Sequence, residues 1–277
     1  GLAAATKTLD FIPTAALLVL HPAYTARMMA TLSNMSGGRV GLNVVTGWSS
    51  AEYEQMDLWP GSEFYESRYD FAAEYLAVLK DLWTTGTCDR KSDYWNLDDC
   101  HCLPMPDHPI PIVSAGQSPA GVDFCDRFAD LRLVIGQPKV LADLERRRQE
   151  GVASNYGTFI LLHMIVEDSD AKARAVGEEI IEKADKAAIA SMIASANMDS
   201  NEGGSSEGVR VSLDQPLEEG NSAFTAISVV HGSPATVAMK LDEMAERTGA
   251  DGFMFSWNHF ESGIRRFGQE VLPRLTC

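Results

Sequence analysis

Short apolar runs alternate with longer amphipathic stretches along most of this chain, and this alternation is the feature that most constrains its fold. The runs with strand character are residues 9–21, 40–47, 109–118, 131–136, 159–168 and 251–257. The stretches with helical spacing are residues 22–39, 65–85, 119–128, 137–150, 168–197, 233–249 and 260–275. Strands that alternate with helices predict an α/β fold with a parallel sheet and crossover helices.

The number of units favours a (β/α)8 barrel of the TIM type over an open doubly wound sheet. The sequence has no G-x-G-x-x-G motif or P-loop, and this absence makes an open doubly wound sheet less favoured. About six strands fall short of eight, so we expect a barrel that lacks its first one or two β/α units. The chain has no initiator Met, and Ala3 to Lys7 has the character of the last turn of a helix. We therefore expect one domain over residues 1–277, with a polar hairpin-like insert at 88–108.

Charge and cysteine content narrow the class of partner. The 277 residues include 39 acidic and 23 basic side chains, for a net charge of −16. This balance argues against nucleic acid and against an anionic membrane surface, and it favours a small molecule or another subunit of a homo-oligomer. No apolar stretch is long enough for a transmembrane helix. The five cysteines are an odd number in a chain of this size, which predicts reduced thiols in a cytoplasmic protein.

One segment departs from the alternating pattern. Residues 198–222 are acidic and rich in Gly and Ser. A long segment of this kind is either a mobile lid over the mouth of the barrel or a disordered insertion. The residues favour neither alternative.

Polar side chains occur within or just after three of the predicted strands. Thr14 lies in the first strand, Asn43 interrupts the apolar run of the second, and Ser118 follows the third. A buried amide is costly unless something bonds to it, so Asn43 indicates that a polar partner lies beside the second strand. Each residue alone also has an ordinary structural interpretation, as a strand Thr or a turn-capping Asn or Ser. We expect them to converge at one end of the barrel.

The stretch AGQSPAG (115–121) is a tight turn that leads into a helix. Backbone N–H groups at a helix start, with Ser118 beside them, suit a phosphate. The guanidinium of Arg68 and the hydroxyl of Tyr69 could bind the same phosphate. The ordinary alternatives are a Ser N-cap before Pro119 and, for Arg68, a solvated helix start. From the residues alone we favour the solvated helix start. Glu52 either accepts bonds from a ligand or caps its local turn.

The sequence gives little evidence for a metal site or for a hydrolytic active site. The stretch Cys100-His101-Cys102 lacks the C-x2-C spacing of zinc sites, so we predict no metal. His163 and His231 do not stand in an H-x-x-H or a recognisable Ser-His-Asp context in the sequence, and no hydrolytic triad is predicted.

Four stretches together resemble the luciferase-like flavin-dependent monooxygenases. They are NVVTGWSSAEYEQMDLWPG, SRYDFAAEYLAVLKDLW, VSAGQSPAG and HFESGIRRFGQEVLP. Within that superfamily they are most similar to the pyrimidine oxygenases that open the uracil ring. The resemblance covers essentially the whole chain, is weakest over 198–222, and leaves about the first quarter of a complete member unmatched. It implies a (β/α)8 barrel of the bacterial luciferase kind.

The resemblance also implies a cofactor and the residues that hold it. Reduced FMN would bind at the carboxyl ends of the strands, with Asn43 and Glu52 near the flavin ring. Arg68, Tyr69 and Ser118 match positions toward the ribityl phosphate. Thr14 and Asn43 match the pair that brackets O2. The earliest FMN contacts of the family fall in the unmatched part.

The activity implied by the resemblance is an FMN- and O2-dependent monooxygenase that opens the ring of uracil or thymine through a flavin peroxide. Such an enzyme serves pyrimidine catabolism, uracil degradation and nitrogen metabolism, and a separate NADH-dependent flavin reductase supplies its reduced FMN. Two alternatives stay open. One is a related monooxygenase of an organosulfur or other heterocyclic substrate, and the other is a flavin-binding barrel fragment without turnover.

Overall fold

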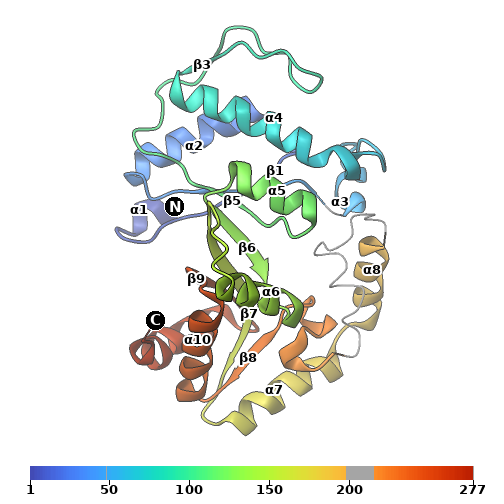
Figure 1. Ribbon diagram of the computed structural model, residues 1–277, viewed down its shortest axis with the longest axis vertical. Coiled ribbons are helices and arrows are strands. Elements are labelled where there is room, and N and C mark those ends of the chain that lie inside the picture. Colours follow the sequence, from blue (N-terminus) through green and yellow to red (C-terminus); the bar gives the residue numbers. More distant parts are fainter. Residues whose placement is uncertain (48, 198–214, 277) are drawn as a thin grey trace. The chain divides into compact units, whose positions relative to one another are not determined.

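The computed structural model describes residues 1–47, 49–197 and 215–276 (Figure 1). The chain divides into two compact units, which are described separately: Gly1–Arg132, and Leu133 onward. The boundary falls inside strand β6 (Leu131–Ile135), whose first two residues belong to unit 1 and whose last three belong to unit 2. The expectation of one domain over 1–277 stays a prediction.

Unit 1 contains the first group of alternating strands and helices. Its elements are α1 (Leu2–Ala5), β1 (Thr14–Ala16), α2 (Pro22–Ser36), β2 (Leu42–Val45), α3 (Ser50–Glu54), α4 (Phe64–Thr84), β3 (Thr87–Cys88), β4 (Cys100–His101), β5 (Ile112–Ser114) and α5 (Pro119–Phe128). Strands β1, β2, β5 and the start of β6 pair in that order, and every pairing is parallel. The predicted α/β class with a parallel sheet is confirmed.

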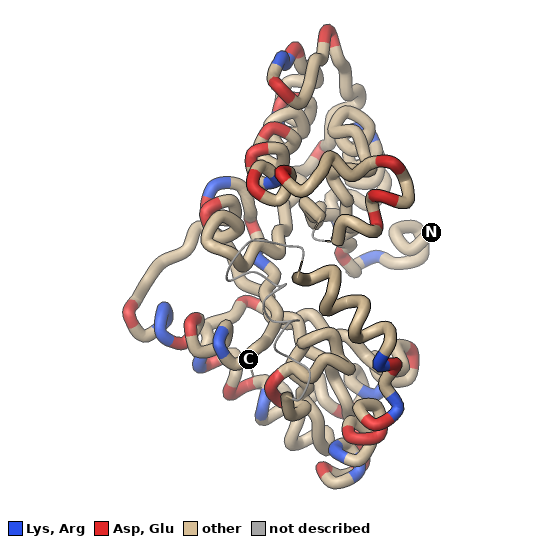
Figure 2. Tube along the Cα trace, turned by 90° about the vertical axis from the view of Figure 1, so that its right-hand side faces the viewer, with Lys and Arg blue, Asp and Glu red and all other residues tan. Residues whose placement is uncertain are grey.

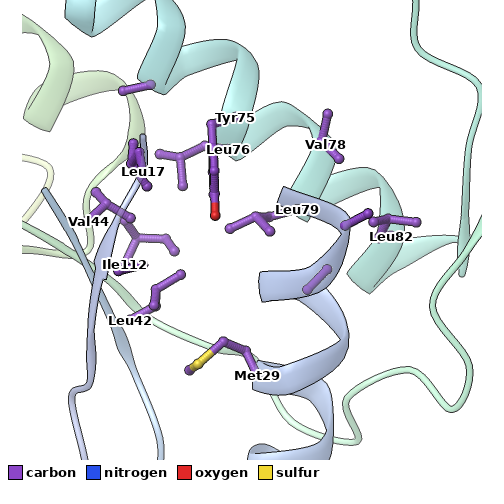
Figure 3. Packing of buried hydrophobic residues seen from close by; sticks show 14 of the residues in the cluster. Leu17, Met29, Leu42, Val44, Tyr75, Leu76, Val78, Leu79, Leu82 and Ile112 are labelled. Carbon is purple, nitrogen blue, oxygen red and sulfur yellow. The ribbon is translucent and has the colours of Figure 1, made fainter. Parts of the chain in front are cut away.

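The core of unit 1 lies between one face of these strands and the helices α2 and α4. Figure 3 shows Leu42, Val44 and Ile112 of the strands packed toward α4. Side chains alternate between the two faces of a strand, so Thr14 and Asn43, which neighbour buried Ala15 and Val44, lie on the face that points away from these helices.

The insert at 88–108 is hairpin-like, as predicted. Strands β3 and β4 pair antiparallel, and an isolated bridge joins Lys91 to Asn96 nearer the tip. Trp95 of the hairpin packs against Phe71 and Tyr75 of α4, with ring centroids 5.4 and 5.9 Å away. The hairpin is therefore anchored to the core by an aromatic side chain.

Unit 2 continues the alternation. Its elements after β6 are α6 (Pro138–Gln149), β7 (Gly157–Val166), α7 (Asp170–Lys183), α8 (Lys186–Ala196), η1 (Leu217–Glu219), η2 (Ser222–Phe224), β8 (Val229–Gly232), α10 (Pro234–Thr248), β9 (Gly252–Trp257), α11 (Phe260–Arg266), the π-helical turn η3 (Phe267–Val271) and η4 (Leu272–Arg274). Strand β7 pairs in parallel with β8 and with β9. The hydrophobic core of unit 2 includes Ile160 and Leu162 of β7 and Leu241 of α10.

Several predicted boundaries were wrong. The run 9–21 forms a strand only at Thr14–Ala16, because Pro13 has no N–H to donate and the chain turns directly after Ala16, where Val19 N bonds to Ala16 O. The long helix expected at 168–197 is broken between α7 and α8, and Asp185 caps the second helix by accepting bonds from the N–H groups of Ala187 and Ala188. The helix expected at 260–275 divides into α11, η3 and η4. Strand β8 was missed.

The segment 198–222 lies mostly outside the described residues, since only 215–222 are described. In that remainder Leu217 is buried and packs against Gly177 and Ile165. The choice between a lid and a disordered insertion stays a prediction.

Charged side chains are spread over both units (Figure 2). Asp and Glu outnumber Lys and Arg by 39 to 23 over the whole chain. Within the described residues, no helix is both long and apolar enough to cross a membrane.

Candidate functional site

The parallel register of β1 and β2 places Thr14 directly beside Asn43. The Nδ2 of Asn43 donates a hydrogen bond to the Oγ1 of Thr14 at 3.1 Å. An amide nitrogen carries two N–H donors and a hydroxyl can accept and donate, so this bond leaves one N–H of Asn43 and the hydroxyl hydrogen of Thr14 for a ligand. The Oδ1 of Asn43 is buried and has no hydrogen-bond partner among the described residues. The pair thus has polar capacity that the described protein groups do not use.

The position of this pair along the strands differs from expectation. Thr14 is the first residue of β1 and Asn43 the second of four in β2, so both lie toward the amino ends of their strands. Only Ser118 lies beyond the carboxyl end of its strand, four residues after Ser114 closes β5.

Arg68 is buried inside unit 1, with 5% of its surface exposed. The solvated helix start that the residues alone favour for Arg68 is therefore wrong. Its Nη1 donates to the carbonyl oxygen of Gly47 at 3.2 Å, and its guanidinium lies 5.7 Å from the ring centroid of Tyr65 and 5.4 Å from that of Tyr69. Gly47 has a φ of +88°, and a Cβ there would lie 2.8 Å from the Tyr53 ring. The turn after β2 therefore brings a carbonyl to the guanidinium.

Tyr69 contacts both the Arg68 guanidinium and the start of α5, where Ser118 is the N-cap. Ser118 is buried and its Oγ accepts a bond from the N–H of Gly121 at 3.3 Å. A Cβ on Gly121 would lie 2.5 Å from the Tyr69 hydroxyl, so that hydroxyl touches the first turn of the helix. A Cβ on Gly116 would lie 2.5 Å from the carbonyl oxygen of Gly121. A buried guanidinium, a tyrosine hydroxyl and a glycine-lined helix start form an arrangement that suits a phosphate.

Glu52 stands apart from the other candidates. It is exposed on α3, and its backbone carbonyl accepts a bond from Gln55 Nε2 at 3.2 Å. Burial and the nearby Glu52 charge raise the pKa of Tyr53. Within the part of the chain that the structure describes, the Glu52 carboxylate makes no contact with the other five candidate residues.

Two histidines of unit 2 have partners that sequence proximity did not reveal. His163 Nδ1 lies 2.9 Å from the Ser256 Oγ, because β7 and β9 pair His163 with Ser256. Its Nε2 is buried without a partner among the described residues, so no carboxylate completes a triad there. His231 Nε2 lies 2.7 Å from Glu218 Oε1, which also accepts a bond from Arg174 at 2.6 Å. Both contacts join residues distant in sequence, and a local motif search cannot find them.

A cavity of about 800 Å³ lies in unit 2, and none of the six candidate residues lines it. Helices α7 and α8 and the turn after β9 form its walls, with Glu179, Lys183, Met192 and His259 among the lining residues. All six candidates belong to unit 1. Among the described residues, no three His, Cys, Asp or Glu side chains are grouped so that they could hold a metal ion.

Comparison with known proteins identifies relatives over the whole chain. A family model described as luciferase-like monooxygenase matches residues 1–252. The pyrimidine monooxygenase RutA of Escherichia coli is 37% identical over 284 aligned residues, which cover 100% of this chain and 77% of that protein.

Solved structures show the same fold at lower identity. The EDTA monooxygenase EmoA of Chelativorans is 19% identical, with a TM-score of 0.77 over 98% of this chain and 74% of that one. The oxygenating constituent of 3,6-diketocamphane monooxygenase from Pseudomonas putida, solved with FMN, is 19% identical, with a TM-score of 0.69 over 99% of this chain and 82% of that one.

The half-buried imidazole of His163 predicts a pH-dependent stability. Burial lowers its pKa from the ordinary 6.5 to about 4. Between these values the unfolded chain binds a proton that the folded chain does not, so stability falls as the pH drops from 6.5 toward 4. Discounted for partial exposure, we expect a loss of about 2 kcal/mol. Urea unfolding of the wild type and of His163→Gln across this range measures it.

His163→Gln should lose less stability than the wild type between pH 6.5 and pH 4, because glutamine does not titrate. His259→Gln, which changes an exposed histidine, is the matched control and should lose as much stability as the wild type. Parallel curves for the wild type and His163→Gln would contradict the assignment.

Proposed function

The chain belongs to the luciferase-like monooxygenase family, and we propose that it uses reduced FMN and O2 to open the ring of uracil or thymine. The family takes small-molecule substrates and receives reduced flavin from reductases. The finer assignment is supported by 37% identity to a pyrimidine monooxygenase over the full length of this chain. The single structural observation that carries it is the Thr14–Asn43 pair, whose remaining donors lie side by side.

We assign the phosphate of FMN to the start of α5. Arg68 supplies a buried positive charge, Tyr69 a hydroxyl at the first turn of the helix, and Ser118 the hydroxyl that caps the helix. The helix start adds the positive end of its dipole. The contact between the Gly116 and Gly121 backbones leaves no side chain in the way of an anion. The residues present therefore fit a phosphate-bearing cofactor.

The Thr14–Asn43 pair would act on the reacting oxygen atoms. Bound reduced FMN supplies the electrons that activate O2 for insertion into the substrate. Preorganised donors aimed at developing negative charge stabilise it without reorganisation, and the free N–H of Asn43 and hydroxyl of Thr14 are two such donors. Asn43 holds Thr14 in place through their hydrogen bond. Glu52 near the flavin ring stays a prediction, since its carboxylate is exposed.

The proposal includes a partner and a compartment. A separate NADH-dependent flavin reductase would deliver reduced FMN, and the reaction would take place in the cytoplasm. The cysteines Cys88, Cys100, Cys102 and Cys125 are all free thiols, in keeping with a reducing environment. A homo-oligomeric state stays a prediction.

A substrate screen tests the proposed activity. The protein, together with FMN, a flavin reductase, NADH and O2, should consume uracil and thymine and release a ring-opened product that mass spectrometry identifies. Organosulfur compounds and other heterocycles are the comparison substrates. Turnover of those compounds without loss of uracil would support the alternative monooxygenase, and flavin binding without any turnover would support the non-catalytic alternative.

Arg68→Met tests the phosphate assignment. A charge-assisted hydrogen bond is worth about 1.5–3 kcal/mol, so FMN affinity should fall by roughly tenfold to a hundredfold. The affinity for riboflavin, which has no phosphate, should change much less. Fluorescence titration with FMN and with riboflavin measures the two affinities in the wild type and the variant. Arg127→Met, at an exposed arginine of α5, is the matched control. An equal loss for both flavins would show that Arg68 acts on the fold instead.

Asn43→Ala separates chemistry from binding. Removing one donor of this kind costs a factor of about a hundred to a thousand in turnover, so oxygenation should fall by that amount. FMN affinity should stay within about tenfold, because the phosphate contacts are intact. Steady-state oxygenation and flavin titration are the two measurements, and Asn96→Ala, at an exposed hairpin asparagine, is the control. Equal losses of binding and turnover would place Asn43 in flavin binding alone.

A further inference from the structure

Two cysteines of the hairpin in unit 1 lie directly opposite each other. Strands β3 and β4 pair antiparallel, and their register sets Cys88 against Cys100. Directly opposed residues of such a pair have Cα atoms about 4.5–5.5 Å apart, which lies within the range that a disulfide spans. Opposed side chains also point to the same face. The register therefore sets the two Cα atoms at a separation that a disulfide can span, and both cysteines are free in the structure.

The two thiols differ in their surroundings. Cys88 is buried, and its Sγ lies 3.7 Å from an Asp81 carboxylate oxygen. Cys100 is partly exposed, and its Sγ lies 4.0 Å from the Arg27 guanidinium. A reactive cysteine is typically accessible and close to a positive charge. Cys100 has both properties, and Cys88 is the thiol placed to react with it next.

Other pairings in this region are less favourable. Cys102 lies two residues beyond Cys100, and that spacing along an extended strand is roughly 6.6 Å between Cα atoms, near the upper limit for a disulfide. Cys125 lies on α5, outside the hairpin. The geometry distinguishes Cys88 as the partner of Cys100.

We propose that Cys88 and Cys100 form a reversible redox site that closes the hairpin. The Cys100 thiolate attacks hydrogen peroxide, and its sulfur becomes a sulfenic acid as the O–O bond breaks and the other oxygen leaves as water after protonation. The Cys88 thiol then attacks that sulfur, an S–S bond forms, and the hydroxyl leaves as a second water. Two thiols and one peroxide thus give one disulfide and two waters. A dithiol reductant reverses the reaction by exchange.

Closure would fasten a segment that already contacts the core. Arg90 follows Cys88 in the sequence, before Cys100, and it forms ion pairs with Asp81 at 2.9 Å and with Glu74 at 3.8 Å. Trp95 of the same segment packs on Phe71. A covalent link across the base of the hairpin restrains the unfolded chain and holds this segment against α4.

Peptide mapping tests the proposal on the full chain in a Cys277→Ser background, which removes the terminal thiol. The protein is treated with hydrogen peroxide without flavin, the remaining thiols are alkylated, and trypsin is added after denaturation. Trypsin cuts after Arg90 and Lys91, so the peptides of Cys88 and Cys100 separate unless a disulfide joins them. We expect mass spectrometry to find most of both peptides as one linked species that a dithiol releases.

Variants identify the pair. In Cys100→Ser the linked species should fall by about tenfold or more, because the accessible thiol is lost, while Cys102→Ala and Cys125→Ser should form it as the parent does. Oxidation should raise the melting temperature of the parent and leave that of Cys100→Ser unchanged. A link between Cys100 and Cys102, or Cys100 oxidised to sulfinic acid without any link, would overturn the proposal. Since no flavin is present, its failure would leave the monooxygenase assignment untouched.

Discussion

The parallel register of β1, β2 and β5 is the constraint on which the rest of unit 1 depends. It pairs Thr14 with Asn43 and Val44 with Ser114, and it sends Ala15 and Val44 into the core. A slip by one residue would turn every side chain to the opposite face. Asn43 would then lie among the apolar side chains of α2 and α4, and Val44 would replace it as the neighbour of Thr14. Core packing and polar placement are therefore two results of one alignment.

A second constraint is the burial of the Arg68 charge. A buried charge is costly unless polar groups surround it, and the Gly47 carbonyl and the faces of Tyr65 and Tyr69 partly meet this need. Gly47 can approach closely because it has no Cβ to clash with Tyr53. The guanidinium thereby joins the turn after β2 to helix α4, and the Tyr69 hydroxyl extends the contact to α5. An anionic ligand would further neutralise the charge.

Local signals predicted much of the fold. Ser118 and Pro119 mark the start of α5, and the structure begins the helix at Pro119 with Ser118 as its cap. The amphipathic stretch at 65–85 became α4 within one residue at each end. Errors arose where distant residues decide the outcome. Arg68 is buried because of a carbonyl 21 residues earlier, and His163 meets Ser256 across 93 residues. Strand β8 (Val229–Gly232) was not predicted from local signals.

The candidate site, like the fold, could be predicted from the sequence only in part. The residue types and the family resemblance together selected Thr14, Asn43, Arg68, Tyr69 and Ser118. The structure pairs Thr14 with Asn43 and Arg68 with Tyr69, and it places the Tyr69 hydroxyl at the helix turn that Ser118 caps. Their contact could not be derived from spacing, since it depends on the register and on helix packing. Their roles at a flavin stay predictions.

The contact between the Gly116 and Gly121 backbones has a consequence for affinity. Main-chain atoms in direct contact have no rotamers to lose, so the start of α5 is already ordered before any anion arrives. Binding there would cost little conformational entropy, and the favourable electrostatic energy would go almost entirely into holding the ligand. Any larger residue at either position would push the loop and the helix apart, so natural sequence variation at this turn should be confined to positions that flank the two glycines.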